Sequence, residues 1–119
     1  MQKHFEELKK NKANYIPLSP LSFLSRTADI FGERTAIVYE DRHYSWQQTY
    51  ERSRALASAL KNHGLRLGDT VSIIAANTPE MYEAHFGVPM AGCVLNTINT
   101  RLEAETIAYI LTDSDSRLL

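Results

Sequence analysis

Histidines and acidic residues are the side chains of this sequence best suited to acid–base or metal chemistry. The four histidines fall on four different predicted elements, without an i,i+4 pair or a carboxylate at metal-ligand spacing; they are His4, His43, His63 and His85. We expect solvent-facing or packing roles for all of them. The paired carboxylates also favour structural roles, because Glu80 with Glu83 suits a helix N-terminus and Asp113 with Asp115 suits a turn.

Cysteine and amide chemistry is equally sparse. Cys93 is the single cysteine, and its apolar neighbours in AGCVL would raise its pKa, so we expect a small core residue and not a nucleophile. A polar cluster lies at the C-terminal end of a predicted parallel strand, where open α/β sheets place ligand sites; it consists of Asn96, Thr97, Asn99 and Thr100. Turn and cap chemistry explains the same residues and is the favoured interpretation.

Recognisable catalytic motifs are absent from the sequence. It contains no G-x-x-x-x-G-K-[ST], G-x-G-x-x-G, G-x-S-x-G or H-E-x-x-H pattern. We therefore assign no catalytic, cofactor-binding or metal-binding residue within these 119 residues.

Composition excludes several classes of function. A net charge of -1, with 44% hydrophobic and 23% charged residues, is typical of globular proteins, and no basic face predicts nucleic-acid binding. No segment approaches the roughly 20 apolar residues of a transmembrane span, and the charged start does not resemble a signal peptide. We expect a cytoplasmic protein, although an address signal at the C-terminus of a longer chain would not be visible here.

The first half of the sequence predicts a helix, a hairpin and a second helix. Ser19-Pro20 is a favourable helix start, and Gly32 ends that helix; its apolar face consists of Leu21, Leu24, Ala28 and Phe31. The next stretch, TAIVYEDRHYSW, predicts a hairpin of two short strands joined by the polar tip EDR. SWQQ has the form of a capping box, and the helix it begins ends at Gly64; its core face is expected to contain Trp46, Tyr50, Ser53, Ala57 and Leu60.

The second half predicts strands alternating with helices. VSIIAA (71–76) and CVLNTI (93–98) are apolar runs typical of parallel strands. The helix between them begins at Thr78, and Pro89 predicts a kink or an early end near Gly87. A further helix is followed by DSDS and by RLL, the start of another strand. This order predicts an α/β fold with an N-terminal hairpin, a mostly parallel βαβ sheet and further chain beyond it.

Several of these stretches together resemble the start of the adenylate-forming acyl-CoA synthetase family, which comprises AMP-binding, acyl-activating enzymes. FGERTAIVYEDRHYSWQQTYERSRALASAL resembles the family's opening hairpin and first long helix. The segment from LRLGDTVSIIAANTPE to NTRLEAETIAYILTDSDSRLL follows the family's order of G-D-x-V, apolar strand, N-x-x-E, helix and N-x-R-L. The similarity extends from about Leu21 to Leu119.

The resemblance implies a domain plan and a reaction. Residues 1–15 would form an N-terminal arm, and residues 16–119 the first part of an AMP-binding N-terminal domain that continues beyond the chain. The parent protein would use ATP, Mg²⁺ and coenzyme A to activate an aliphatic short- or medium-chain carboxylic acid as an acyl-adenylate, and then transfer the acyl group to coenzyme A. The family's catalytic motifs lie downstream, so this chain alone would be inactive. The resemblance also suggests a homodimer.

One residue departs from the family pattern, and two other functions stay open. Glu103 stands where many members have Thr or Ser, so we expect the helix cap to move to Thr100, with Glu103 completing a capping box. The alternatives are a non-catalytic α/β binding or interaction module and an aryl-acid–CoA ligase of the same family.

Overall fold

A computed structural model of the chain describes residues 9–13 and 15–119. Most of the predicted arm over residues 1–15, including His4, therefore lies outside the described residues. The elements are α1 (Pro20–Phe31), β1 (Thr35–Tyr39), β2 (Arg42–Ser45), α2 (Trp46–Asn62), β3 (Thr70–Ile74), α3 (Pro79–Met90), β4 (Val94–Ile98), α4 (Ala104–Asp113) and β5 (Ser116–Leu118). The predicted order of helices and strands is confirmed.

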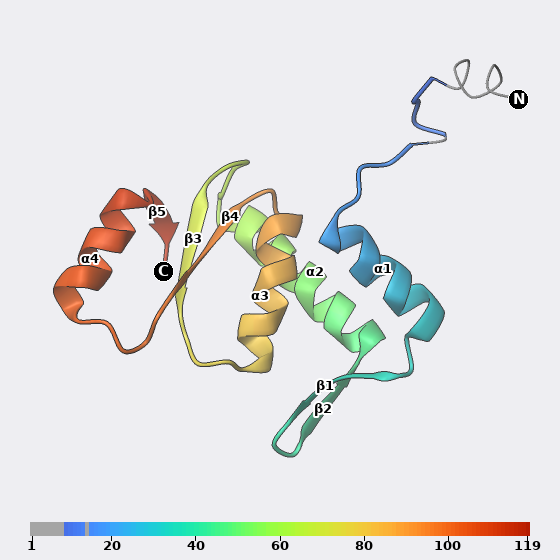
Figure 1. Ribbon diagram of the computed structural model, residues 1–119, viewed down its shortest axis with the longest axis horizontal. Helices are drawn as coiled ribbons and strands as arrows, with labels where there is room; N and C mark the ends of the chain where they lie inside the picture. The colour runs from blue at the N-terminus through green and yellow to red at the C-terminus, as the bar shows by residue number, and fades with distance from the viewer. Residues whose placement is uncertain (1–8, 14) are drawn as a thin grey trace, which may run out of the picture.

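The strands form two separate sheets. β1 and β2 pair as an antiparallel hairpin, whereas β3 lies between β4 and β5 in a parallel sheet of order β4-β3-β5. Figure 1 shows α2 and α3 on one side of this sheet and α4 on the other. The predicted α/β fold, with a hairpin leading into a parallel βαβ sheet, is confirmed.

The main core lies between α2, α3 and the parallel sheet. Its buried members are Ala57, Leu60, Val71, Ala84, Val88, Ala91 and Cys93. Thr49 and Ser53 also lie buried on α2, and each hydroxyl donates to the backbone carbonyl four residues earlier, Ser45 O and Thr49 O, at 2.8 Å. Because each hydroxyl is hydrogen-bonded within its own helix, the cost of burying these two polar residues on α2 is offset.

The predicted helix ends follow local rules, and the structure confirms them. Ser19 Oγ accepts from Leu21 N at 3.2 Å, with Pro20 as the first residue of α1. At the start of α2, Ser45 Oγ accepts from Gln48 N at 3.2 Å, and Gln48 Oε1 accepts from Ser45 N at 2.9 Å, which completes the capping box. Gly64 has a φ of 93°, the left-handed conformation that favours glycine after a helix.

Two local predictions are wrong, and of the two outcomes predicted for α3 at Pro89, the early end does not occur. α3 does not end near Gly87 but continues to Met90, because Pro89 sits in the last turn, where its missing N–H removes a single helical bond. Glu103, and not Thr100, is the N-cap of α4, and it makes no side-chain cap hydrogen bond. β3 ends at Ile74 instead of Ala76, since its partner β4 pairs with it only as far as Ile98.

Candidate functional site

The carboxyl ends of β3 and β4 meet at one edge of the parallel sheet. Ile74 pairs with Ile98 at the end of the register, so the segments that follow both strands lie beside the start of α3. They enclose a hollow of about 550 Å³, which we call the strand-end hollow; its lining includes Asn77, Met81, His85, Thr97, Asn99 and Thr100. Open α/β sheets hold their ligands at this kind of edge, which makes the hollow the candidate site.

The predicted Asn/Thr cluster is divided between two places. Thr97, Asn99 and Thr100 line the strand-end hollow. Asn99 Oδ1 also accepts from Arg101 N at 3.0 Å, so the favoured turn interpretation holds for this residue. Asn96 instead donates from Nδ2 to Ser72 Oγ at 2.9 Å and to Ser114 Oγ at 3.1 Å. Asn96 is therefore a structural residue between strand and helix.

His85 is the histidine that belongs to the hollow. Its Nδ1 lies 2.8 Å from the Met81 carbonyl oxygen one turn earlier on α3. A carbonyl oxygen can only accept, so Nδ1 is the donor in this contact. His43 and His63 are exposed, on the hairpin and after α2, and neither lines the hollow. Among the described residues, no three His, Cys, Asp or Glu side chains form a group that could hold a metal ion.

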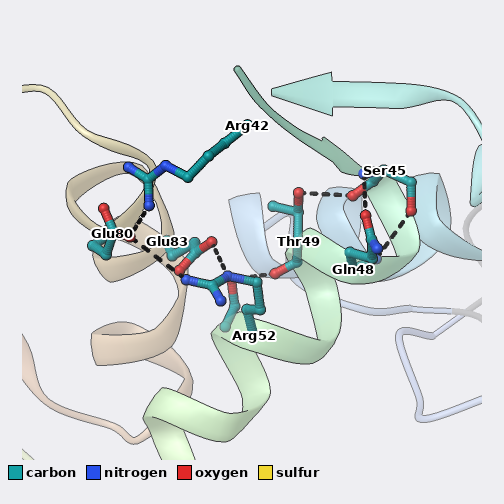
Figure 2. Close-up of polar contacts among 8 residues, drawn as sticks. Arg42, Ser45, Gln48, Thr49, Arg52, Glu80 and Glu83 are labelled. Carbon is teal, nitrogen blue, oxygen red and sulfur yellow. Dashed lines mark hydrogen bonds and ion pairs between the residues drawn. The ribbon is translucent and has the colours of Figure 1, made fainter. Parts of the chain in front are cut away.

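The Glu80 and Glu83 pair is a structural ion network and not an acid–base pair. Arg42 Nη1 on β2 donates to Glu80 Oε1 at 2.8 Å, and Arg52 Nε on α2 donates to Glu83 Oε1 at 2.5 Å (Figure 2). Arg52 Nη2 also lies 3.8 Å from Glu80 Oε1, so both carboxylates share one arginine. The network connects the hairpin to α2 and α3.

The protonation state of Glu80 follows from its position at the start of α3. Its own backbone N–H is the main cause that lowers its pKa to about 2, followed by Arg42 and the Thr78 side chain. The guanidinium pKa of Arg42 is raised, chiefly by its hydrogen bond to Glu80. The predicted role of Glu80 at a helix N-terminus is confirmed.

The remaining candidates also have structural roles. Cys93 is buried, its Sγ lies 3.6 Å from the Arg66 carbonyl oxygen, and burial together with the Asp69 charge raises its pKa. It is the small core residue that the sequence predicts. Asp115 has a φ of 47° in the turn before β5, as predicted, whereas Asp113 is the last residue of α4 and not a turn residue.

The sequence interpretation missed a cluster of hydroxyl groups on the α4 side of the sheet. Ser72 and Ser116 share a hydrogen bond of 2.5 Å, Ser114 and Ser116 share one of 2.8 Å, and Asn96 completes the cluster. The sequence did indicate this cluster, because a polar residue interrupts each of two apolar runs: Ser72 in VSIIAA and Asn96 in CVLNTI. These two residues are direct partners in the β3–β4 register.

The chemistry of the strand-end hollow is that of binding. Its polar lining consists of amide, hydroxyl and imidazole groups. Such a lining offers both donors and acceptors for an uncharged hydrogen-bonding ligand, but it holds no activated nucleophile and no paired carboxylates.

Comparison with known proteins decides the family. The AMP-binding enzyme family matches residues 24–119. The chain belongs to this family. Among curated AMP-binding relatives, acetate–CoA ligase CCL3 of Humulus lupulus is 53% identical over 111 residues, which are 93% of this chain and 20% of that protein. The peroxisomal trans-cinnamate:CoA ligase of Petunia hybrida is 50% identical over 114 residues, covering 96% of this chain and 20% of its own length.

Solved structures of AMP-binding enzymes share the fold. The anthranilate CoA ligase AuaEII in complex with anthranoyl-AMP superposes with a TM-score of 0.81 at 28% identity, over 91% of this chain and 22% of that one. The chain thus spans about a fifth of the length of the curated relatives. In the part of the chain that is described, no helix has the length and apolarity needed to cross a membrane.

Proposed function

We propose that these residues form the first part of the N-terminal domain of an ATP-dependent acyl-CoA ligase, with residues 1–15 as an arm and 16–119 within the domain. The observation that carries the proposal is the 53% identity to an acetate–CoA ligase over 93% of the chain. The α/β fold and the ligand-sized hollow at the strand ends agree with it.

The proposed reaction has two steps. The carboxylate oxygen of the acid attacks the α-phosphorus of ATP, forming an acyl-adenylate and releasing pyrophosphate. The thiol sulfur of coenzyme A then attacks the acyl carbon, forming a thioester and releasing AMP and a proton. ATP would enter as its Mg²⁺ complex, and no residue of this chain is assigned to that ion. This chain would contribute the supporting strands and helices and the lining of the strand-end hollow, and the reacting groups would lie elsewhere in the protein.

The proposed substrate is a short- or medium-chain aliphatic acid. The name of the Humulus lupulus relative specifies acetate, which supports this choice. The Petunia hybrida relative is named for trans-cinnamate at 50% identity, so an aryl acid is the second candidate.

Activity measured with a panel of acids tests both the proposed ligase reaction and the proposed preference for aliphatic acids. The complete protein encoded by the gene is incubated with ATP, Mg²⁺, coenzyme A and one acid at a time, and pyrophosphate release and thioester formation are measured. We expect kcat/KM to be highest for acetate or butyrate and lowest for cinnamate. A preference for cinnamate would establish the aryl alternative, and thioester formation with none of the acids would contradict the ligase proposal.

Location and assembly are part of the same proposal. The cytoplasmic location stays a prediction, because the Petunia hybrida relative is named as peroxisomal. A homodimer is proposed for the complete protein, and light scattering coupled to size exclusion measures its mass directly.

A further inference from the structure

A groove between α1 and α2 carries charged chemistry that the strand-end hollow lacks. It has a volume of about 570 Å³ and is lined by the first half of α1, by α2 and by the end of α3; its members include Ser22, Ser25, Arg54, Ser58, Lys61 and Met90. We call it the helix groove. α2 and α3 end here before leading into β3 and β4, whereas the hollow lies where those strands end. The groove therefore lies among the helices toward the amino ends of these strands, and the hollow lies at their carboxyl ends.

The polar groups of the helix groove are mainly hydrogen-bond donors. Arg54 and Lys61 supply two positive charges, and no carboxylate lines the groove. Neither side chain forms an ion pair within the described part of the chain. The hydroxyls of Ser25 and Ser58 have no hydrogen-bond partner among the described residues. Cations and hydroxyls in this combination recognise anionic oxygens.

The arrangement of these groups follows from helix geometry. Arg54, Ser58 and Lys61 are spaced by four and three residues, so they lie along one face of α2. Arg54 and Lys61 are about 10 Å apart along the helix axis at their backbones. The Arg54 guanidinium also lies 5.6 Å from the centre of the ring of Tyr50, another residue of the lining.

The distance between Arg54 and Lys61 and the volume of the helix groove indicate what kind of ligand could bind there. A single carboxylate can satisfy one cation, whereas a diphosphate carries anionic oxygens on two phosphorus atoms and can reach both. The groove volume lies within the range of small-molecule sites, about 300 to 1,000 Å³. We infer that the helix groove binds a small molecule that carries a diphosphate group.

Titration calorimetry with inorganic pyrophosphate at fixed salt tests the inference on the complete protein. We expect Arg54→Glu and Lys61→Glu each to weaken one class of pyrophosphate sites by about tenfold or more, because each removes a charge-assisted contact and adds a repulsive charge. Arg26→Glu makes the same charge change on α1 outside the groove lining and should leave the affinity unchanged. Pyrophosphate bound at a catalytic site would persist in all three variants.

Two further measurements distinguish a loss of binding from a loss of folding. Arg54→Lys retains the charge and should keep most of the affinity, and the circular dichroism spectrum of each variant verifies that it folds. Since Lys61 is exposed and makes no side-chain hydrogen bond within the described region, Lys61→Glu carries the test if Arg54→Glu does not fold. Unchanged affinity and stoichiometry in Lys61→Glu would overturn the inference. So would binding of an oligoglutamate peptide, but not pyrophosphate, at these residues.

Discussion

Glu80 and Glu83 show how two carboxylates three residues apart acquire different environments. The Glu83 side chain is 7% exposed and is neutralised by Arg52, whereas the Glu80 side chain is 53% exposed and faces Arg42. Breaking the buried pair would leave a charge out of water, while the exposed pair is screened by solvent. The two ion pairs thus differ in what they contribute, although they share one network.

The lowered pKa of Glu80 predicts a specific dependence of stability on pH. Its folded-state pKa of about 2 lies below the ordinary 4.5, so its stabilising effect is full above about pH 4.5 and is lost as the pH falls toward 2. Glu80→Gln should therefore reduce stability at about pH 6 and have little effect near pH 2. Because the side chain is half exposed, we expect a difference below about 1 kcal/mol.

Urea unfolding of the complete protein at a series of pH values measures this difference. Glu33→Gln is the matched control, since Glu33 is exposed and makes no ion pair among the described residues. A Glu80→Gln curve that runs parallel to the wild type at every pH would show that the carboxylate contributes nothing.

Residue-scale predictions from sequence succeed where the cause is local. The Ser45–Gln48 capping box involves residues three apart, so its chemistry can be read along the chain. The Arg52–Glu83 contact joins residues 31 apart, and the Ser72–Ser116 contact joins residues 44 apart. Only the packing of α2 on α3 and of β5 on β3 brings these groups together, so the ion network and the hydroxyl cluster were not predictable from single segments.

At the scale of elements, Gly87 determines how closely α3 approaches α2. A Cβ built at this position would lie 2.7 Å from Leu56 Cδ2, 2.9 Å from Leu56 Cβ and 2.9 Å from the Ser53 carbonyl oxygen. Gly87→Ala should therefore destabilise the α2–α3 pair by about 1 to 3 kcal/mol, although alanine favours a helix. Hydrogen exchange of α2 and α3 peptides in the complete protein measures this loss.

A second substitution tests which of these atoms causes the clash. Leu56→Ala removes Cδ2 but keeps its own Cβ, and the Ser53 carbonyl is unchanged, so the double variant Leu56→Ala/Gly87→Ala should stay destabilised. Gly87→Ala with wild-type protection would show instead that the helices separate at little cost.

The order of helices and strands was predictable because helix caps and hydrophobic periodicity are properties of local sequence. Where a strand or helix ends, by contrast, depended on the elements beside it. Ser19-Pro20 and Gly64 mark helix ends in the sequence itself. The end of β3 is determined by how far β4 extends beside it, and the cap of α4 by the path of the chain after β4. Neither the end of β3 nor the cap of α4 can therefore be predicted from the sequence of that element alone.

At the scale of the whole molecule, the two sides of the parallel sheet differ in how much apolar surface is buried. α2 and α3 bury their shared face, but no residue of α4 is buried. Tyr109 on α4 is 68% exposed and Val94 on β4 is 52% exposed. Within the described sheet, β4 and β5 are edges with free backbone donors and acceptors. Such edges and apolar surface promote association between chains.

The 119-residue chain studied alone should therefore self-associate. We expect concentration-dependent oligomers in sedimentation velocity and binding of a hydrophobic dye, because pairing at the β4 or β5 edge satisfies the free backbone groups. Val94→Lys places a charge on the β4 edge and should reduce association, whereas Ala55→Lys adds the same charge on the exposed side of α2 and should not. A monodisperse wild-type monomer whose Trp46 fluorescence reports one cooperative melt would instead show an autonomous domain, and would strengthen the binding-module alternative.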